Sequence, residues 1–274
     1  MLESGPRIFA LFGNPVGHSL SPLMHQTAYR EMKIDAVYVP FCVRILEEAV
    51  RGIRGMGIRG VSVTLPFKSE VLRHLDEVEE SALRIGAVNT IVNEEGRLQG
   101  YNTDWVAFVR DLKEFMPVRG KTFGILGAGG AARAVLFGIL SQGGKAVVLN
   151  RTEEKGETLA KEFGCPFLPL SETGALEADC MVNTTSVGLA PQVENSPLEG
   201  RIFGKVSRVV DIIYNPLETK LLKDARKAGC RTRSGLGMFV HQGAEQIRLW
   251  TGAEPPVESM KRAVRQRLEK NEKN

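Results

Sequence analysis

Short apolar stretches alternate with amphipathic ones along the chain, which is the pattern of an α/β protein. In the first part of the sequence, the pattern predicts strands over residues 7–13, 36–43 and 60–65, and helices over residues 23–32 and 45–56. The stretches 87–93 and 97–101 flank the turn Glu94-Glu95-Gly96 and predict a β-hairpin. A helix follows, with Thr103 as its cap, Asp104 in its first turn and residues 105–115 as its body.

The same alternation starts again after a short interruption. The segment Met116-Pro117-Val118-Arg119-Gly120 ends the helical pattern, and its proline and glycine predict a domain boundary. Beyond it, strands are predicted over residues 121–126, 146–149, 180–183 and 209–213, and helices over residues 131–141, 152–163 and 218–228. Two further helices are predicted over residues 237–250 and 255–268. A length of 274 residues agrees with two domains of ordinary size.

Composition excludes several classes of protein. With 43% hydrophobic and 25% charged residues, the chain has the make-up of a folded globular protein, which excludes disorder and low complexity. The net charge of +4 is too small to indicate nucleic-acid binding, although it suits a small anionic ligand. No apolar run reaches the ~18 residues of a membrane span. We therefore expect a small-molecule partner, and neither nucleic acid nor a membrane.

The cysteines and histidines predict neither disulfides nor a metal site. Cys42, Cys165, Cys180 and Cys230 are scattered and form no Cys-x-x-Cys pair, so we expect reduced thiols in the cytoplasm. The four histidines do not have the spacing of metal ligands, and no metal is expected. Glycine is over-represented, at 29 residues against a usual share of about 7%, which indicates tight turns and close approach of the backbone to a ligand.

A glycine-rich turn follows the predicted strand over residues 121–126. Its sequence, Gly127-Ala128-Gly129-Gly130-Ala131-Ala132, matches the Gly-x-Gly-x-x-Gly/Ala pattern of a dinucleotide-binding turn. In that pattern Gly127 permits the tight turn, Gly129 lets the backbone approach a pyrophosphate, and Ala132 keeps the helix close to the strand. The alternative is a merely structural turn between a strand and a helix.

The end of the next predicted strand indicates which dinucleotide is bound. A site for NAD usually has Asp or Glu there, which accepts hydrogen bonds from the ribose hydroxyls. This chain has Asn150-Arg151-Thr152, with Lys155 one helical turn farther on. A guanidinium binds a 2′-phosphate that a carboxylate would repel, so the sequence favours NADP. The alternative is a surface arginine on a loop.

The first half of the sequence contains polar residues that its predicted strands and turns do not require. Ser19 and Ser21 lie two positions apart before a predicted helix, and the alternative for Ser21 is a plain N-cap. Thr64 alternates with apolar residues, which places it away from the apolar face of its strand. Lys68 is predicted at a helix start, where a cation opposes the helix dipole, so its position suggests function. Asn89 interrupts an apolar strand.

Together these motifs resemble those of the shikimate dehydrogenase family. The matching segments occur in order over nearly the whole chain, at residues 13–22, 61–68, 86–90, 100–104, 127–131, 150–152, 211–216 and 235–242. Each segment is weak evidence alone, but the set is highly specific. The resemblance implies an NADP-dependent oxidoreductase that reversibly reduces 3-dehydroshikimate to shikimate, on the route to chorismate and the aromatic amino acids.

The resemblance also implies roles for particular residues. Lys68 would be the catalytic lysine that handles the proton, with Asp104 as its counter-charge, whereas a structural salt bridge between them is the alternative. The substrate would be bound by Ser19, Ser21, Thr64, Asn89, Asp104, Tyr214 and Gln242. The cofactor NADP would be bound by Gly127, Ala128, Gly129, Gly130, Ala131, Asn150, Arg151, Thr152 and Lys155, and its nicotinamide end would lie near Glu80, Ile212 and Gly237.

The implied fold is α/β with two domains. A substrate-binding α/β domain would span residues 1–104, a linker helix 105–117, and a Rossmann-type, doubly wound NADP-binding domain 118–236, while C-terminal helices over 237–274 would return to the first domain. Shikimate or 3-dehydroshikimate is the expected partner, and a homodimer is left open.

Three alternative functions are weighed against this one. A quinate/shikimate dehydrogenase with a broader range of substrates and cofactors is disfavoured by Asn150-Arg151 and by the paired serines. A non-catalytic, dinucleotide-binding regulator would need neither Lys68 nor Asp104. A methyltransferase that uses the glycine turn for S-adenosylmethionine is poorly served by Arg151, because that ligand has no phosphate.

Overall fold

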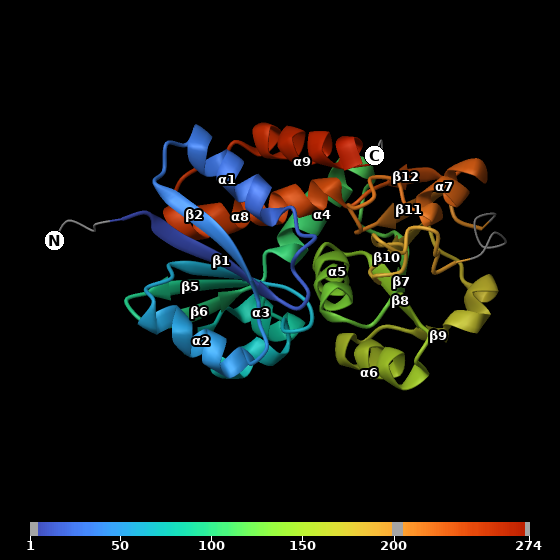
Figure 1. Ribbon diagram of the computed structural model, residues 1–274. Coiled ribbons are helices and arrows are strands. Elements are labelled where there is room, and N and C mark those ends of the chain that lie inside the picture. The colour runs from blue at the N-terminus through green and yellow to red at the C-terminus, as the bar shows by residue number, and fades with distance from the viewer. Residues whose placement is uncertain (1–4, 199–204, 272–274) are drawn as a thin grey trace. The chain divides into compact units, whose positions relative to one another are not determined.

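Each half of the chain builds its own six-stranded sheet (Figure 1). The computed structural model describes residues 5–198 and 205–271. The chain divides into two compact units: the first unit comprises residues 1–103 and 240–266, and the second unit comprises residues 104–239 and 267–274. The predicted segment 1–104 begins in residues that lie outside the described ones, and the predicted segment 237–274 ends in such residues.

The first unit contains a mixed sheet with the strand order β2-β1-β3-β5-β6-β4. Its strands are β1 (Arg7–Gly13), β2 (Ala36–Cys42), β3 (Gly60–Val63), β4 (Glu77–Val78), β5 (Thr90–Glu94) and β6 (Arg97–Tyr101). Its first helices are α1 (Ser21–Glu31), α2 (Leu46–Gly55), a 3₁₀ helix (Glu70–His74) and α3 (Glu80–Ile85). Because β1 runs parallel to both β2 and β3, the carboxyl ends of these strands share one edge of the sheet. Ligands of open α/β sheets bind at that edge.

Two C-terminal helices, α8 (Leu236–Thr251) and α9 (Val257–Asn271), complete the chain, and α8 packs on the first sheet. Trp250 of α8 stacks on Phe9 of β1, with 5.0 Å between the ring centroids. Its indole Nε1 donates a hydrogen bond to the carbonyl oxygen of Ile91 in β5, at 3.0 Å. The expected return of the C-terminal helices to the first sheet is confirmed.

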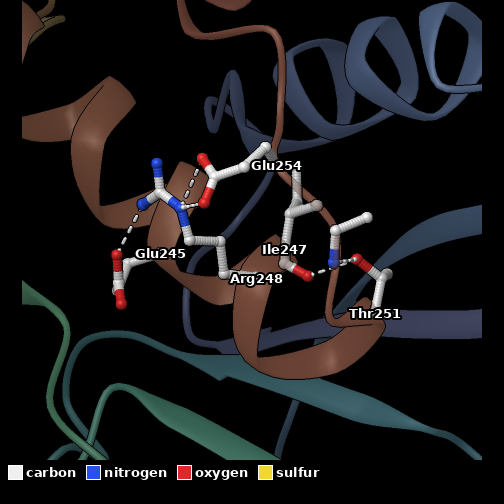
Figure 2. A network of polar contacts seen from close by, with 6 residues as sticks. Glu245, Ile247, Arg248, Thr251 and Glu254 are labelled. Atoms are coloured by element: carbon white, nitrogen blue, oxygen red, sulfur yellow. Dashed lines mark hydrogen bonds and ion pairs between the residues drawn. The ribbon is translucent and has the colours of Figure 1, made fainter.

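A network of polar contacts fixes the end of α8 (Figure 2). Arg248 forms ion pairs with Glu254, at 2.8 Å, and with Glu245, at 2.6 Å. The Thr251 hydroxyl donates a hydrogen bond to the carbonyl oxygen of Ile247, at 2.7 Å. Since Glu254 lies beyond the last residue of α8, the network attaches the helix to the segment that follows it.

His25 of α1 is completely buried among aromatic rings of the first unit. Its ring stacks on that of Tyr38, with centroids 4.1 Å apart and planes inclined by 6°. The Tyr29 hydroxyl lies 3.5 Å from His25 Nδ1, and the Trp250 ring centroid lies 5.5 Å from that of His25. Burial lowers the pKa of His25 to about 3, and the side chain of Gln246 offsets this only in part. His25 is therefore neutral in the folded protein at weakly acidic pH.

We expect the protein to lose stability as the pH falls below 6.5, because the unfolded chain then binds a proton at His25 that the folded protein does not bind. Between pH 7 and pH 5 the loss from His25 is about 2 kcal/mol. Asp211 has the opposite effect, because burial raises its pKa from 3.8 to about 6, so its protonation over that range stabilises the folded state. Urea unfolding at both pH values should show a smaller loss for His25→Gln than for the unmodified protein, and equal losses would contradict this assignment.

The second unit contains an all-parallel sheet with the strand order β12-β11-β10-β7-β8-β9. Its strands are β7 (Thr122–Leu126), β8 (Lys145–Asn150), β9 (Phe167–Pro169), β10 (Cys180–Asn183), β11 (Arg208–Asp211) and β12 (Arg231–Arg233). Its helices are α4 (Asp104–Phe115), α5 (Gly130–Ser141), α6 (Glu153–Phe163), a 3₁₀ helix (Leu170–Ala175) and α7 (Lys220–Lys227). The chain proceeds outward from β7 to β9 and then outward from β10 to β12 on the other side. The predicted doubly wound fold is confirmed, and its strand order reverses between β7 and β10, the usual place for a dinucleotide.

Several short elements were not predicted from the sequence. They are β4, β9, β12 and α3, which have 2, 3, 3 and 6 residues. Elements of this length contain too few residues to show a hydrophobic period. No helix within residues 5–198 and 205–271 is long and apolar enough to cross a membrane.

Candidate functional site

Polar residues of three separate segments meet at the carboxyl edge formed by β1 and β3. The loop after β1 is joined to the loop after β3 by a hydrogen bond from the Asn14 N–H to the Leu65 carbonyl oxygen, at 2.9 Å. The last residue of β3, Val63, donates its N–H to the carbonyl oxygen of Asn89, at 2.8 Å. Asn89 directly precedes β5, so the edge of the sheet brings these segments together although they are distant in sequence.

Gly13, the last residue of β1, leaves the space at this edge that the Thr64 side chain occupies. A Cβ atom placed on Gly13 would lie only 2.3 Å from Thr64 Cγ2, so the absence of a side chain at Gly13 makes room for Thr64. The Thr64 N–H also donates to the Phe12 carbonyl oxygen, at 2.9 Å. Thr64 thereby leaves the strand in a fixed position, with a half-buried side chain.

Ser19 and Ser21 form a hydroxyl pair at the start of α1. Their Oγ atoms are 3.1 Å apart, and Ser19 Oγ accepts a hydrogen bond from the Ser21 N–H, at 3.2 Å. The N-cap residue of α1 is Leu20, whose side chain makes no capping hydrogen bond. The alternative in which Ser21 serves as a plain N-cap is therefore wrong, because Ser21 is the first residue within the helix.

Lys68 lies in the turn that follows β3, half-buried, and not at a helix start. The helix predicted there is wrong: residues 65–69 form a turn, and only the five-residue 3₁₀ helix from Glu70 follows. The argument from an opposing helix dipole therefore does not apply to Lys68. What fixes the turn is a hydrogen bond from the Val88 N–H to the Lys68 carbonyl oxygen, at 2.7 Å, which places the Lys68 backbone beside the segment of Asn89.

The amide of Asn89 is buried and has a defined orientation. Its Oδ1 accepts hydrogen bonds from the Thr103 N–H and from Thr90 Oγ1, both at 2.8 Å. Its Nδ2 donates to Thr103 Oγ1, at 3.0 Å. Asp104 follows Thr103 directly and begins α4, where the helix dipole favours a carboxylate.

The other expected substrate residues lie on α8 and after β11. Gln242 is half-buried on α8, one turn before Gln246. Tyr214 is half-buried in the second unit, and its ring stacks on that of Phe239 with 3.8 Å between centroids. Glu80 is exposed at the first residue of α3.

In the second unit, the glycine-rich turn lies at the strand-order reversal. Gly127 has a φ of 111°, which favours glycine, and its N–H donates to the Leu149 carbonyl oxygen, at 2.8 Å. Gly129 is the N-cap residue of α5, and a Cβ placed on it would meet nothing within 4 Å. No side chain caps α5, and its first turn has no acidic residue. The N–H groups of this helix end could therefore hold a pyrophosphate.

The loop after β8 and the first turn of α6 expose the two expected basic residues to solvent. Arg151, Thr152 and Lys155 are exposed. Asn150 ends β8, and its Nδ2 donates to the Thr152 carbonyl oxygen, at 2.8 Å, which closes the loop. The Arg151 guanidinium of this loop and the Lys155 ammonium of α6 are the charged groups that could hold a 2′-phosphate.

Gly237 and Ile212 lie where the backbone of the second unit is tightly packed. A Cβ on Gly237 would lie 1.7 Å from Asp111 Oδ1, so a larger residue there would displace the Asp111 carboxylate. That carboxylate accepts hydrogen bonds from Arg233 Nε at 3.1 and 3.2 Å. Ile212 donates its N–H to the Asn183 carbonyl oxygen, at 3.1 Å.

Two residues next to the site were missed by sequence reasoning. Ser62 alternates with valines in β3, and Gln246 lies on the buried face of α8; their side chains are 5% and 1% exposed. They are joined by a hydrogen bond from Ser62 Oγ to Gln246 Oε1, at 2.8 Å. A polar residue inside an apolar helical face was the available signal at Gln246. Within residues 5–198 and 205–271, no three His, Cys, Asp or Glu side chains are grouped as a metal site requires.

Comparison with known proteins agrees with this geometry. The family described as shikimate dehydrogenase substrate binding domain matches residues 11–91, and the shikimate 5′-dehydrogenase C-terminal domain matches residues 235–265. A shikimate dehydrogenase (NADP(+)) from Caldanaerobacter subterraneus subsp. tengcongensis is 44% identical over 262 residues, which cover 92% of this chain and 94% of that protein. Another, from Pyrococcus abyssi, is 45% identical and covers 96% of this chain and 99% of its own.

The likeness extends to three dimensions. The crystal structure of shikimate 5-dehydrogenase from Thermus thermophilus, in complex with NADP(H) and shikimate, matches this chain with a TM-score of 0.88 and 41% identity. The match covers 95% of this chain and 99% of that one. With such identity over almost the full length of its relatives, and with the same fold, the chain belongs to the shikimate dehydrogenase family.

Proposed function

We propose that this protein catalyses the NADPH-dependent, reversible reduction of 3-dehydroshikimate to shikimate. The observation that carries the proposal is the meeting of Thr64, Lys68 and Asn89 on hydrogen-bonded segments at the carboxyl edge of the first sheet. Relatives named as NADP(+)-dependent shikimate dehydrogenases, and a Thermus thermophilus structure that holds NADP(H) and shikimate, support the substrate and the cofactor.

The first unit supplies groups that suit a carboxylate with several hydroxyls. Ser19 and Ser21 would bind the shikimate carboxylate, because their paired hydroxyls lie at the start of α1, where the helix favours an anion. Thr64, Asn89 and Gln242 would bind the rest of the substrate through hydroxyl and amide groups. The resemblance also assigns Tyr214, together with Asp104, to substrate binding.

Lys68 and Asp104 would handle the proton. Reduction of the substrate carbonyl leaves negative charge on its oxygen, and that oxygen needs a proton donor within hydrogen-bond reach. The Nζ atom of Lys68 would give this proton during reduction and remove it during oxidation. Asp104 would act as the counter-charge that keeps Lys68 oriented, with its own carboxylate stabilised at the start of α4.

The second unit has residues that fit NADP. Gly127 to Ala131 would bind the pyrophosphate at the N-terminus of α5, and Asn150 to Thr152, with Lys155, would bind the 2′-phosphate. When bound, the nicotinamide supplies or accepts the hydride. Ile212, Gly237 and Glu80 are assigned to the nicotinamide end on the resemblance.

These residue assignments give the two domains different roles. The domain over residues 1–104, with the C-terminal helices, would bind the substrate, and the domain over residues 118–236, after the linker helix 105–117, would bind NADP. We also propose a cytoplasmic location, which is supported by the four cysteines, because none of them is in a disulfide among the described residues.

The experiment that tests this function is a set of initial-rate measurements with shikimate or quinate, each paired with NADP⁺ or NAD⁺. We expect the highest kcat/KM with shikimate and NADP⁺. Comparable values with quinate or NAD⁺ would favour the broader quinate/shikimate dehydrogenase. A protein that binds NADP⁺ but turns over neither substrate would favour the non-catalytic regulator and contradict the proposal.

A further inference from the structure

We propose that Gln246 is a positioning residue that fixes the amide of Asn89 for substrate binding. Gln246 is 1% exposed on α8 and reaches the edge of the first sheet. Its Nε2 donates to the Asn89 carbonyl oxygen, at 3.2 Å, and to Thr90 Oγ1, at 3.1 Å, while its Oε1 accepts from Ser62. Both ends of the amide are thus engaged. The inference rests on the proposed function, because it takes Asn89 to bind shikimate.

The hydrogen bonds around Gln246 run in one direction, from Tyr38 to Asn89. The Tyr38 hydroxyl donates to Ser62 Oγ, at 2.7 Å, and Ser62 Oγ donates to Gln246 Oε1, at 2.8 Å. Gln246 Nε2 then donates to Thr90 Oγ1, and Thr90 Oγ1 donates to Asn89 Oδ1, at 2.8 Å. The Ser62 and Thr90 hydroxyls each accept on one side and donate on the other, so the chain has a defined proton order.

That order agrees with the way the Asn89 amide faces, which the Thr103 N–H also fixes. The Asn89 Oδ1 atom faces two donors, Thr90 Oγ1 and the Thr103 N–H, each 2.8 Å away. A flipped amide would place its NH₂ group against both donors. The Nδ2 atom, which also donates to Thr103 Oγ1 at 3.0 Å, is therefore the end of the Asn89 amide that would donate to a hydroxyl of the substrate.

The partners of the Gln246 amide are buried, so the hydrogen bonds of Gln246 are costly to lose. Ser62, Asn89 and Thr90 are 5%, 2% and 0% exposed, so water does not readily take over hydrogen bonds that the Gln246 amide would leave. Without Gln246, Ser62 loses its acceptor and Thr90 loses its donor. The Thr90 hydroxyl can then turn toward Thr103 Oγ1, 3.4 Å away, and its hold on Asn89 weakens.

The helix that carries Gln246 is itself fixed near this residue. One turn farther along α8, the Trp250 indole is bonded to the Ile91 carbonyl oxygen, at 3.0 Å. On the other side of the same turn, Arg248 is paired with Glu254 (Figure 2). A helix held in this way gives the Gln246 amide a constant position from which to orient Asn89.

The test is steady-state kinetics of Gln246→Met, which keeps the size of the side chain and removes its hydrogen bonds. We expect KM for shikimate to rise about tenfold, as for a lost buried hydrogen bond, and KM for NADP⁺ to stay within about twofold. Ile247→Val is the matched control, because Ile247 is completely buried on the same helix and is not part of the polar chain. It should lose stability without a change in either KM.

Two further variants distinguish positioning from packing. Thr90→Val removes the link between Gln246 and Asn89, so it should raise KM for shikimate in the same way, and the double variant should add little to either single change. Gln246→Glu keeps an acceptor but loses its donor when ionised. Its KM for shikimate should therefore be raised, as in Gln246→Met, at a pH where the carboxyl is ionised.

An unchanged KM for shikimate in folded Gln246→Met would overturn the inference, as would fully additive effects with Thr90→Val. Should Gln246→Met fail to fold, Thr90→Val answers the same question. Asn89→Ala separates this inference from the proposed function. If Asn89→Ala also leaves KM unchanged, the proposed substrate site has failed, whereas an effect at Asn89 without one at Gln246 or Thr90 refutes only the positioning role.

Discussion

Lys68→Met is expected to lower kcat for shikimate oxidation by about 10²–10⁴-fold, the usual contribution of general acid–base catalysis. The reason is that the substrate oxygen would then have no side chain to exchange its proton with. The turn that carries Lys68 would persist, because it is fixed through the Lys68 carbonyl oxygen and the Val88 N–H. KM for shikimate should change far less, since the hydroxyl and amide groups that bind it remain.

Two other variants complete this experiment. Lys113→Met replaces an exposed lysine of α4 and should leave kcat unchanged. Asp104→Asn should lower kcat and also raise KM for shikimate, because it removes both the counter-charge and an acceptor. Circular dichroism confirms that each variant is folded. If Lys68→Met retained kcat within about threefold of the unmodified protein, the proton-transfer role would be refuted and the structural salt bridge would remain.

The double variant Asn150→Asp/Arg151→Ala is expected to lower the preference for NADP⁺ over NAD⁺ by about 100-fold, measured as the ratio of their kcat/KM values. The change removes the guanidinium that would pair with the 2′-phosphate and adds a carboxylate that repels it. Glu153 and Glu154 in the first turn of α6 add further negative charge that would repel the 2′-phosphate once Arg151 is absent. The carboxylate introduced at the end of β8 would accept hydrogen bonds from the ribose hydroxyls of NAD⁺ instead.

KM for shikimate serves as the internal control for this variant, because the change lies in the second unit at the loop after β8. Lys161→Ala, an exposed lysine at the far end of α6, should leave the cofactor ratio unchanged. A double variant that favours NADP⁺ as strongly as the unmodified protein would show that this loop does not bind the 2′-phosphate.

Elements with a strong local pattern were predictable from the sequence. The strands β1 and β10 lie at the predicted residues 7–13 and 180–183, because each is a buried apolar run with polar or turn residues at its ends. The glycine-rich turn and the Asn150 loop were also predictable from local sequence. Both follow a strand and precede a helix, and their chemistry depends on that local order.

The remaining features depend on contacts between distant residues. Ser62 alternates with valines as a residue on a solvated face would, yet it is buried, because its partner Gln246 lies on α8, 184 positions away. Lys68 follows a proline and a phenylalanine as a helix start would, but the segment forms a turn that Val88 holds from another part of the chain. Local periodicity contains no information on either partner.

The proposed substrate and cofactor sites are tested most directly by a crystal structure of the protein with shikimate and NADP⁺. We expect the shikimate carboxylate within hydrogen-bond distance, about 2.5–3.0 Å, of the Ser19 and Ser21 hydroxyls. A ring hydroxyl should lie equally close to Lys68 Nζ, another should accept from Asn89 Nδ2, and the 2′-phosphate should contact Arg151. Shikimate bound away from the carboxyl edge of β1 and β3, with Lys68 out of reach of every hydroxyl, would contradict the proposed site.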